Sequence, residues 1–302
     1  MNAQRAPVAL APEFSARVLH DVSMAKHTSW HAGGPADFFF TPRDIMDLAS
    51  FLRQLPTEVP VMWVGLGSNL LVRDGGIRGA VVSTHGALGA LERHSATRIR
   101  AEAGVPCARI AKQCVKWGLG PAEFLAGIPG TLGGALAMNA GAWGGETWQH
   151  VVEVEVLDRR GVRHTRTPAD YEIGYRHVKG PDDEWFIGAR MEFERRPGVS
   201  GNAIRELLDK RRDTQPIGEW SCGSVFTNPL GDHAARLIES AGLKGFRIGD
   251  ASVSEKHANF IINHGAARSA DIEALIAHIQ QAVHAVHGVL LHTEVRIVGE
   301  SA

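Results

Sequence analysis

The sequence predicts an α+β fold that is divided into more than one domain. Segments with the helical spacing of apolar residues and short apolar runs typical of strands both occur along the whole chain. Its 302 residues are long for a single hydrophobic core, and its 44% apolar and 22% charged residues are ordinary for a globular protein.

The N-terminal part predicts a compact lobe. Residues 1–19 are expected to be a loose lead-in, because Ala, Pro and polar groups are mixed there. The apolar run 38–40 predicts a strand, and the tetrapeptide TPRD at 41–44 predicts the first turn of a helix that continues to Leu52. Two further strands are predicted at residues 59–64 and 79–82.

The middle of the chain predicts a second lobe. Residues 108–117 have helical spacing, and Gly118 ends that helix. Alternation of Val and Glu at 151–157 predicts a half-exposed strand. Gly161 predicts a turn after it, so that 162–166 could return as the second strand of a hairpin. Other strands are predicted at 98–103, 162–166 and 186–193.

A turn-rich stretch at 197–201 (PGVSG) is the expected domain boundary. It separates a first domain at 20–199, with lobes at about 20–85 and 86–199, from a second domain at 200–302. In the second domain an apolar stripe predicts a helix from Ser269 to Gly288. Helices are also predicted at 203–212 and 234–241, and a last strand at 290–298.

Charge and cysteine content narrow the function classes. A net charge of −1 gives no sign of a nucleic acid partner, and no segment has the pattern of a signal peptide. The chain has three cysteines, an odd number, and no CxxC motif, which argues against a disulfide framework and a zinc site. We therefore expect the protein to work in the reducing cytoplasm; the cysteines are Cys107, Cys114 and Cys222. We expect a monomer that does not attach to membranes.

Residues 127–145, GIPGTLGGALAMNAGAWGG, hold seven glycines and no charge, although 34 glycines in 302 residues predict about two there. Such a density has a conformational cost, so an ordered backbone that approaches a ligand closely is the favoured interpretation. A flexible linker would contain more Ser and fewer large apolar residues, and a membrane-spanning helix would not contain this many glycines.

Residues 65–69, GLGSN, follow a predicted strand and form a loop of small residues. Such a loop presents several N–H groups to one anion, but it is also typical of an ordinary tight turn. The third glycine of a dinucleotide fingerprint would fall at Leu70, and no P-loop lysine follows, so this is neither of those motifs.

Three other segments carry candidate chemistry. Arg176 lies next to Tyr175, one of only two tyrosines, and is either an anion-binding group or a surface residue. Ser224 lies in SCGSVFTNP without a serine-hydrolase elbow, and nothing nearby activates Cys222 as a nucleophile. Glu294, in LHTEVR, is either a half-buried acid or a solvent-facing strand residue. The scattered histidines lack metal-ligand spacing.

Taken in order, these motifs resemble the UDP-N-acetylenolpyruvoylglucosamine reductase family. The resemblance covers about residues 26–298, with Trp30 where Phe is more usual. The motifs that carry it are GLGSNLLVRDGG, GIPGTLGGALAMNAGAWGGE, YRH, GSVFTNP, KGFRIGDASVSEKHANFIIN and HTEVRIVG.

The resemblance implies a two-lobed FAD-binding domain of the vanillyl-alcohol-oxidase type, followed by an α+β substrate domain. It implies non-covalent FAD, NADPH as co-substrate, and a UDP-sugar whose enolpyruvyl group is reduced. The cofactor residues implied are Gly65, Leu66, Gly67, Ser68, Asn69, Leu70, Gly127, Ile128, Pro129, Gly130, Gly133, Gly134, Met138, Asn139 and Gly141.

By the same resemblance, Ser224 matches a proton donor, and Arg176 and Glu294 match a pair that stabilises an enolate-like intermediate. We expect Ser224 and Glu294 on one wall of the flavin site and Arg176 on the other. The charges suit a reaction that places negative charge on a carboxylate. The implied substrate contacts are Tyr175, Asn228 and Lys244.

The chain departs from the family pattern at Thr227, where many members have Lys or Arg. This leaves one phosphate contact open, and Lys244 or Arg212 are candidates to supply the charge. The short distance between Arg176 and Lys210 predicts the subclass that lacks an extra substrate-capping loop.

Two rival interpretations remain open at this point. The first is an FAD-dependent oxidase of the same fold, which often binds its flavin covalently through a His or Cys near the first loop; here His85 lies well beyond that loop. The second is a non-catalytic nucleotide-sugar binding protein, and the joint presence of Arg176, Ser224 and Glu294 argues against it.

Overall fold

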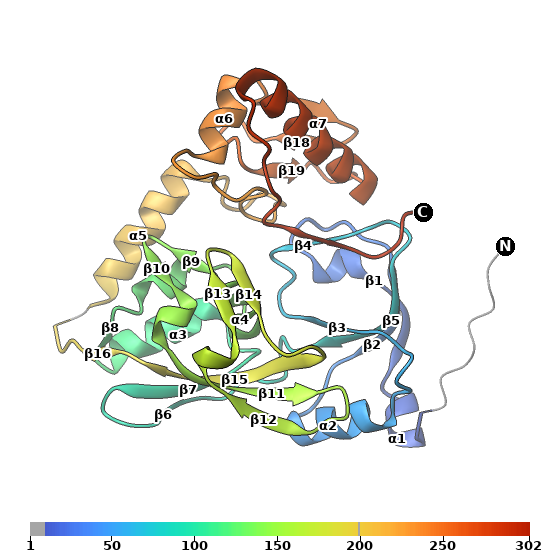
Figure 1. The fold of residues 1–302 in the computed structure, drawn as a ribbon, viewed down its shortest axis with the longest axis vertical. Coiled ribbons are helices and arrows are strands. Elements are labelled where there is room, and N and C mark those ends of the chain that lie inside the picture. The colour runs from blue at the N-terminus through green and yellow to red at the C-terminus, as the bar shows by residue number, and fades with distance from the viewer. Residues whose placement is uncertain (1–9, 199) are drawn as a thin grey trace.

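The computed structural model describes residues 10–198 and 200–302. Its strands and helices form three groups around a common centre (Figure 1). The first group is a sheet near the N-terminus, the second is a larger sheet with its helices, and the third is the C-terminal part of the chain. The predicted mixture of helices and strands, α+β, is confirmed.

The first sheet has four strands in the order β1-β2-β5-β3, with β1 antiparallel and the others parallel. Helix α2 packs beside it through apolar residues spaced as predicted. The helix starts later than predicted, because Asp44 is its N-cap. The Asp44 carboxylate accepts a hydrogen bond from the Asp47 amide at 2.8 Å. The bounds are β1 Leu19–Ser23, β2 Pro35–Phe40, β3 Val61–Val64, β5 Ile77–Ser83, α1 Pro12–Ser15 and α2 Ile45–Gln54.

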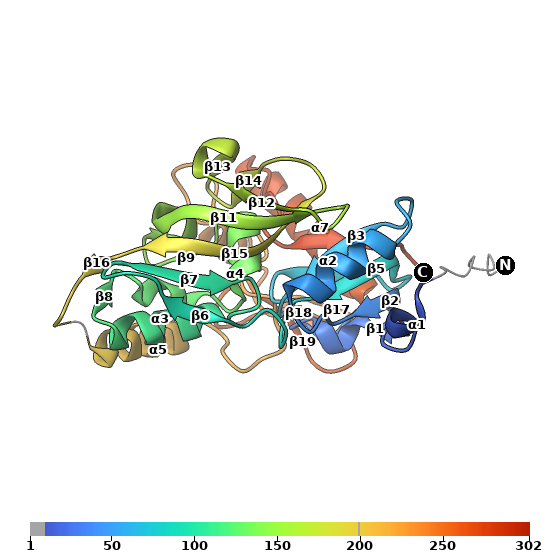
Figure 2. The same ribbon diagram turned by 90° about the horizontal axis from the view of Figure 1, so that it is seen from below.

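The second sheet has five antiparallel strands in the order β12-β11-β15-β7-β6. Helices α3 and α4 contribute to its main hydrophobic core, and α3 and α5 lie on one side of the sheet (Figure 2). The bounds are β6 Leu91–Arg93, β7 Arg98–Glu102, β11 Val151–Asp158, β12 Arg163–Arg166, β15 Glu184–Glu192, α3 Cys107–Lys116, α4 Leu132–Met138 and α5 Gly201–Thr214.

Strand β11 is more buried than its alternating sequence predicts. It lies between two other strands, and Glu155 is only 5% exposed. The Glu155 carboxylate is neutralised by Arg100 at 2.8 Å and Arg163 at 2.5 Å, and these charges lower its pKa against the effect of burial. A polar residue in a strand pattern therefore marked a buried ion pair here rather than an exposed face.

The C-terminal group combines two helices with a small sheet of order β17-β18-β19. Strand β20 leaves this group and pairs in parallel with β4, directly after the predicted anion loop (Figure 1). The predicted strand 290–298 is therefore shorter, and Glu294 precedes β20 rather than lying within a strand. The bounds are α6 Ala234–Ser240, β17 Arg247–Ile248, β18 Ala251–Val253, β19 Ile261–Asn263, α7 Ser269–His287, β20 Arg296–Val298 and β4 Leu70–Val72.

Short elements complete the fold. The hairpin of β13 and β14 carries the Tyr175-Arg176 turn, and α5 begins at the predicted boundary with Ser200 as its N-cap. The bounds are β8 Leu119–Gly120, β9 Gly141–Ala142, β10 Gly145–Glu146, β13 Glu172–Gly174, β14 His177–Lys179 and β16 Glu194–Arg195. Single turns of 3-10 helix cover Met24–His27, Glu123–Gly127, Thr147–His150 and Pro168–Asp170.

The expected loose lead-in is wrong for the residues that the structure describes. Phe14 on α1 is 2% exposed and packs against the rings of Phe40 and Phe51. The same cluster includes Leu157 and Ile187 from the second sheet, so one core joins the two sheets. Residues 1–9 of the lead-in lie outside the described chain.

Candidate active site

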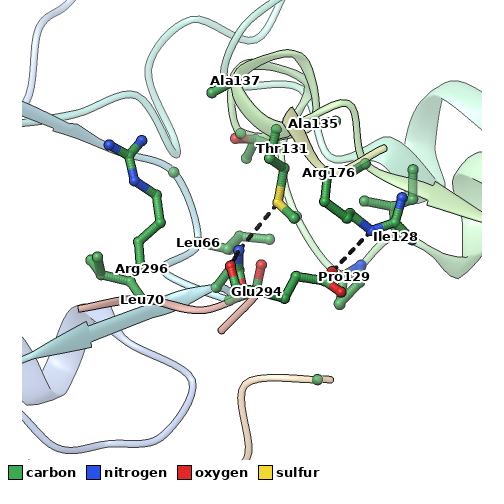
Figure 3. Close-up of a pocket in the computed structure, with 18 of the residues that line it drawn as sticks. Leu66, Leu70, Ile128, Pro129, Thr131, Ala135, Ala137, Arg176, Glu294 and Arg296 are labelled. Atoms are coloured by element: carbon green, nitrogen blue, oxygen red, sulfur yellow. Dashed lines mark hydrogen bonds and ion pairs between the residues drawn. The ribbon is translucent and has the colours of Figure 1, made fainter. Parts of the chain in front are cut away.

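A cavity of about 870 Å³ lies where the first sheet, the glycine-rich segment and the C-terminal group meet. This volume is within the usual range for small-molecule and cofactor sites. All of the predicted site residues line the cavity except Asn139 and Lys244. Residues far apart in the sequence are thus brought to one place, as Figure 3 shows for Leu66, Ile128, Arg176 and Glu294.

The loop 65–70 connects β3 to β4 at one side of the cavity. Gly67 has φ +62°, and a Cβ there would lie 2.0 Å from the carbonyl oxygen of His27. A Cβ on Gly65 would lie 2.3 Å from Thr131 Oγ1. Both glycines are therefore required by contacts within the chain. Within the described residues, the amides of 66–69 donate to no protein acceptor, which is what an anion-binding loop needs.

The glycine-rich segment 127–145 lies against this loop. A Cβ on Gly127 would lie 2.6 Å from the Trp143 ring, and one on Gly133 would lie 3.0 Å from the Cβ of Ala103. On Gly141 it would lie 2.4 Å from the carbonyl oxygen of Gly145. Gly134 differs, because a Cβ there would meet nothing within 4 Å. Close contact with the chain itself explains most of these glycines, whereas Gly134 leaves space at the cavity wall.

Arg176 is held in place by three acceptors. Its Nε donates to Glu294 Oε1 at 3.0 Å, and its Nη1 and Nη2 donate to the carbonyl oxygens of Asn139 and Gly141 at 3.2 and 3.0 Å. The expectation that Arg176 and Glu294 lie on opposite walls is therefore wrong: they form an ion pair, drawn as a dashed line in Figure 3. A guanidinium has five N–H groups, so two remain for a ligand.

Glu294 is largely withdrawn from water, with 15% of its side chain exposed. Burial raises the pKa of its carboxyl group, and the charge and hydrogen bond of Arg176 oppose this effect without reversing it. Of the two sequence interpretations, the half-buried acid is therefore the correct one. A raised pKa makes the protonated, hydrogen-bond-donating form of Glu294 more accessible than for an exposed glutamate.

Ser224 is connected to Glu294 through the backbone. The Glu294 amide donates to the carbonyl oxygen of Val225 at 2.8 Å. The side chain of Asn259 accepts from the amide of Phe226 at 2.9 Å and donates to its carbonyl oxygen at 2.8 Å. These bonds fix the segment that carries the Ser224 hydroxyl. Burial raises the pKa of the neighbouring Cys222 thiol to about 12, which agrees with the absence of an activated nucleophile.

Asn139 supports the site from behind the cavity wall. It ends α4 with φ +47° and is 2% exposed. Its amide nitrogen donates to Glu146 and to the carbonyl oxygen of Gly174, and its Oδ1 accepts from the Trp148 amide. It also offers its own carbonyl oxygen to Arg176. Asn139 thus positions Arg176 and the turn that carries it.

Only two of the three predicted substrate contacts line the cavity. Tyr175 and Asn228 line the cavity, and Tyr175 is 50% exposed with its ring centroid 4.9 Å from the Arg176 guanidinium carbon. Lys244 and Arg212 do not line it; they pair with Glu239 at 2.8 Å and with Asp209 at 3.0 Å, respectively. Neither residue therefore places its charge on the cavity wall, and Thr227 does not line the cavity either.

Sequence reasoning missed several residues of the cavity. Arg296 follows Glu294 by two positions, and on an extended chain such residues point to the same side. Arg296 could therefore have been predicted from the position of Glu294. Lys210 and Arg211 lie on α5 in a run of basic residues that gives no sign of which one faces inward. The other missed lining residues include Trp63, Thr131 and Trp185.

Comparison with known proteins identifies the family. A family profile described as the UDP-N-acetylenolpyruvoylglucosamine reductase C-terminal domain matches residues 215–298, and one described as an FAD binding domain matches residues 36–166. The reductase of Alkalilimnicola ehrlichii is 58% identical over 283 residues, covering 93% of this chain and 95% of the relative. The chain belongs to the UDP-N-acetylenolpyruvoylglucosamine reductase family.

Further relatives agree with this assignment. The reductase of Methylococcus capsulatus is 54% identical over 279 residues, with 92% of each chain covered. The crystal structure of the Thermus caldophilus reductase superposes with a TM-score of 0.80 at 32% identity, covering 93% of this chain and 98% of that chain. The resemblance seen in the sequence is confirmed, and so is the prediction that the protein is an FAD-dependent oxidoreductase. The comparisons favour the reductase over both rival interpretations.

The residues present fit FAD. The unpaired amides of 66–69 suit a diphosphate, the open space at Gly134 suits a group that approaches the backbone, and the buried Thr131 Oγ1 has no hydrogen-bond partner among the described residues. The described residues between Arg176 and Lys210 form β14, β15, β16 and the start of α5, together with the short turns that join them. They include no separate capping loop.

None of the described helices has the length and apolar content needed to span a membrane.

Proposed function

We propose that this protein reduces the enolpyruvyl group of UDP-N-acetylglucosamine enolpyruvate to UDP-N-acetylmuramate, with NADPH as the electron source. The single observation that supports this best is the Arg176–Glu294 ion pair, which lines one cavity together with Ser224 and the glycine-rich segments in a chain of this family. The product is a precursor of peptidoglycan, so the protein acts in cell-wall synthesis.

The predicted cofactor residues, apart from Asn139, would hold the FAD. The amides of 66–69 would bind the diphosphate, and the segment 127–141 would contact the flavin ring through its backbone. When bound, the flavin supplies hydride transfer, which no amino-acid side chain can perform. The protein contributes position, charge and the proton.

Arg176 and Glu294 act on the substrate carboxylate. Addition of a hydride to the double bond places negative charge on this carboxylate, and the two N–H groups of Arg176 that no protein acceptor occupies can bind it. Glu294 in its protonated form donates a second hydrogen bond. Both groups are held rigidly before the reaction, which is the condition for effective electrostatic stabilisation.

Ser224 gives a proton to the carbon next to the carboxylate. The reaction adds one hydride and one proton across the double bond, so a proton donor is required besides the hydride source. A serine hydroxyl is a weak acid, and it serves here only because the carbanion is strongly basic and close. The fixed backbone at Val225 and Phe226 supports this role, since it holds the hydroxyl in one position.

We propose Tyr175 and Asn228 as substrate contacts, and Lys210 rather than Lys244 as a candidate to supply the charge that Thr227 lacks. Lys210 lies on the cavity wall, whereas Lys244 is paired elsewhere. We also propose a flavin domain at 20–199, a substrate domain at 200–302 and a monomer. The free, buried cysteines support work in the reducing cytoplasm.

An anaerobic two-step experiment tests the proposal. NADPH should bleach the absorbance of the oxidised flavin, and addition of the enolpyruvyl UDP-sugar should restore it. Bleaching without recovery would contradict the proposed substrate, and a purified protein that never binds flavin would contradict the cofactor. NADH in place of NADPH is the control for the choice of nicotinamide nucleotide.

A further inference from the structure

The strand pair of β4 with β20 joins the two proposed domains. Among the described residues, it is the only sheet that connects the C-terminal group to the rest of the chain (Figure 1). Each strand contributes only three residues, Leu70–Val72 and Arg296–Val298. The loop 65–70 leads into β4, and Glu294 lies two residues before β20. This strand pair therefore sets how the two sides of the cavity meet.

A pair of three-residue strands is marginal by itself, and a shift of one residue would turn each side chain to the opposite face. At the cavity end, the Arg296 amide donates to the Asn69 carbonyl oxygen at 3.1 Å. Asn69 Nδ2 donates to the carbonyl oxygen of Glu294 at 3.0 Å. A shift of β20 on β4 would move Glu294 away from its ion-pair partner Arg176.

At the other end of β4, Asp74 caps a helix of the C-terminal group. Its Oδ1 accepts from the amide of Ser269 at 3.0 Å, and its Oδ2 accepts from the amide of Ala270 at 2.9 Å. These are the first two residues of α7, and Arg268 at the N-cap has no side-chain acceptor. The first amides of a helix lack partners within it, and a carboxylate there is also favoured by the helix dipole. The cap is thus supplied from 195 positions away in the sequence.

Two further contacts bind α7 at the same place. Ser269 is fully buried, and its hydroxyl donates to the Val72 carbonyl oxygen at 2.6 Å. The Arg73 guanidinium binds both carboxylate oxygens of Glu273, through Nη2 at 2.7 Å and Nε at 3.0 Å. Three successive residues, 72 to 74, therefore each bind the start of α7. None of the three lines the cavity, so any effect on the reaction must act through other residues.

Helix α7 extends this attachment to the proposed catalytic residues. Its apolar face packs in one core with Val225 and Val295. These two residues directly follow Ser224 and Glu294 in the sequence. The position of α7 on β4 therefore sets where Ser224 and Glu294 lie relative to the loop 65–70.

We propose that Asp74 is a positioning residue for substrate reduction, which acts by fixing the start of α7 to the end of β4. The inference rests on the proposed function and adds a residue outside the cavity that sets its catalytic geometry. Asp74 holds Ser224 and Glu294, which act on the substrate, at a constant distance from the loop 65–70, which binds the cofactor. Rates depend steeply on such a distance, since a displacement of about 1 Å can cost about 100-fold.

The test is Asp74→Ala in the anaerobic two-step experiment with the FAD-loaded full chain. We expect the rate constant of flavin reoxidation at saturating enolpyruvyl UDP-sugar to fall about tenfold or more. The sugar concentration at half-maximal rate and the dissociation constant of FAD should change less than about twofold, because no proposed contact residue is altered. Asp74→Asn keeps one acceptor oxygen, so its rate should lie between those of the wild type and Asp74→Ala. It also serves as the test if the alanine variant does not fold.

Asp47→Ala is the matched control. Asp47 also accepts from a backbone amide, that of Arg43 at 2.8 Å, and it pairs with Arg17 at 2.7 Å. It lies on α2, which does not line the cavity. Its loss should lower the Tm and leave the rate of reoxidation, measured well below that Tm, unchanged.

An equal fall in the rate of reoxidation for Asp47→Ala and Asp74→Ala would overturn the inference, because general destabilisation would explain both. An unchanged rate in Asp74→Ala would overturn it too. So would a loss of FAD affinity as large as the loss of rate, because the effect would then lie in the loop 65–70. A wild-type chain whose reduced flavin is not reoxidised by the enolpyruvyl UDP-sugar would instead contradict the proposed function.

Discussion

Two walls of the same cavity are built in different ways. The glycine wall, residues 65–70 and 127–145, is shaped by close contacts within the chain that leave no room for a side chain at most of its glycines. The charged corner, formed by Arg176, Ser224 and Glu294, is shaped by an ion pair and by hydrogen bonds that hold side chains in place. The difference agrees with the proposed roles, in which shape and backbone amides bind the cofactor, and charge and a proton act on the substrate.

The largest effect on the glycine wall is expected for Gly67→Ala. The new Cβ would lie 2.0 Å from the His27 carbonyl oxygen, and alanine is strained at φ +62°. Strain of this kind costs about 1–3 kcal/mol before the overlap is counted, and the loop must move to relieve it. We expect loss of bound flavin together with a lower Tm, measured by flavin content and thermal unfolding. Full flavin content would contradict the proposed role of this loop.

The charged corner is tested by Arg176→Lys. Lysine keeps the charge but cannot bind Glu294, Asn139 and Gly141 at once while it offers two further N–H groups to a carboxylate. We expect the rate of substrate reduction to fall about 100-fold or more, as for loss of a transition-state donor. FAD binding should be unchanged, so equal losses in both measurements would count against the division between the walls.

A neighbouring pair of glycines separates structure from ligand binding. In Gly133→Ala the new Cβ meets Ala103 at 3.0 Å, and this overlap opposes the helix preference of alanine, so the Tm of the flavin-free protein should be lower than that of Gly134→Ala. In Gly134→Ala the new Cβ meets only open space at the cavity wall, and alanine favours the helix by about 1 kcal/mol. That variant should have a raised Tm without flavin and a weaker affinity for FAD. The opposite ranking of Tm would show that the contacts at Gly133 are not limiting.

A smaller effect is expected from the titration of Glu294. Burial raises its pKa above the ordinary 4.5, so the folded protein keeps a proton that the unfolded chain has lost. Stability contributed by this group is full below pH 4.5 and is lost as the pH rises through the raised pKa. The Tm of the wild type minus that of Glu294→Gln should therefore decrease as the pH is raised from about 4 to about 7. An increase would mean that the Arg176 ion pair outweighs burial.

Local patterns predicted the fold better than they predicted the site geometry. Apolar spacing located α7, from Ser269 to His287, and the two segments of the glycine wall were visible as clusters of small residues. The contact between Arg176 and Glu294 was not predictable, because it joins residues that are 118 positions apart. The stack of Trp63 on Trp185 depends in the same way on how two sheets meet.

The glycines of 127–145 were predicted for a reason that is only partly correct. Close approach of a ligand is consistent with Gly134, but Gly127, Gly133 and Gly141 are required by neighbouring parts of the chain. A glycine in the sequence indicates that a side chain is excluded at that position, but it does not indicate whether a ligand or another part of the chain excludes it. The family assignment supplies the ligand, and the contacts supply the distinction between the two causes.

The most direct test of the division between the walls is Ser224→Ala in the anaerobic two-step experiment. Loss of this hydroxyl leaves the glycine wall intact, so FAD should bind with wild-type affinity and NADPH should bleach it at the wild-type rate. The enolpyruvyl UDP-sugar should then fail to restore the flavin absorbance. Restoration at the wild-type rate, or loss of FAD from the variant, would contradict the account.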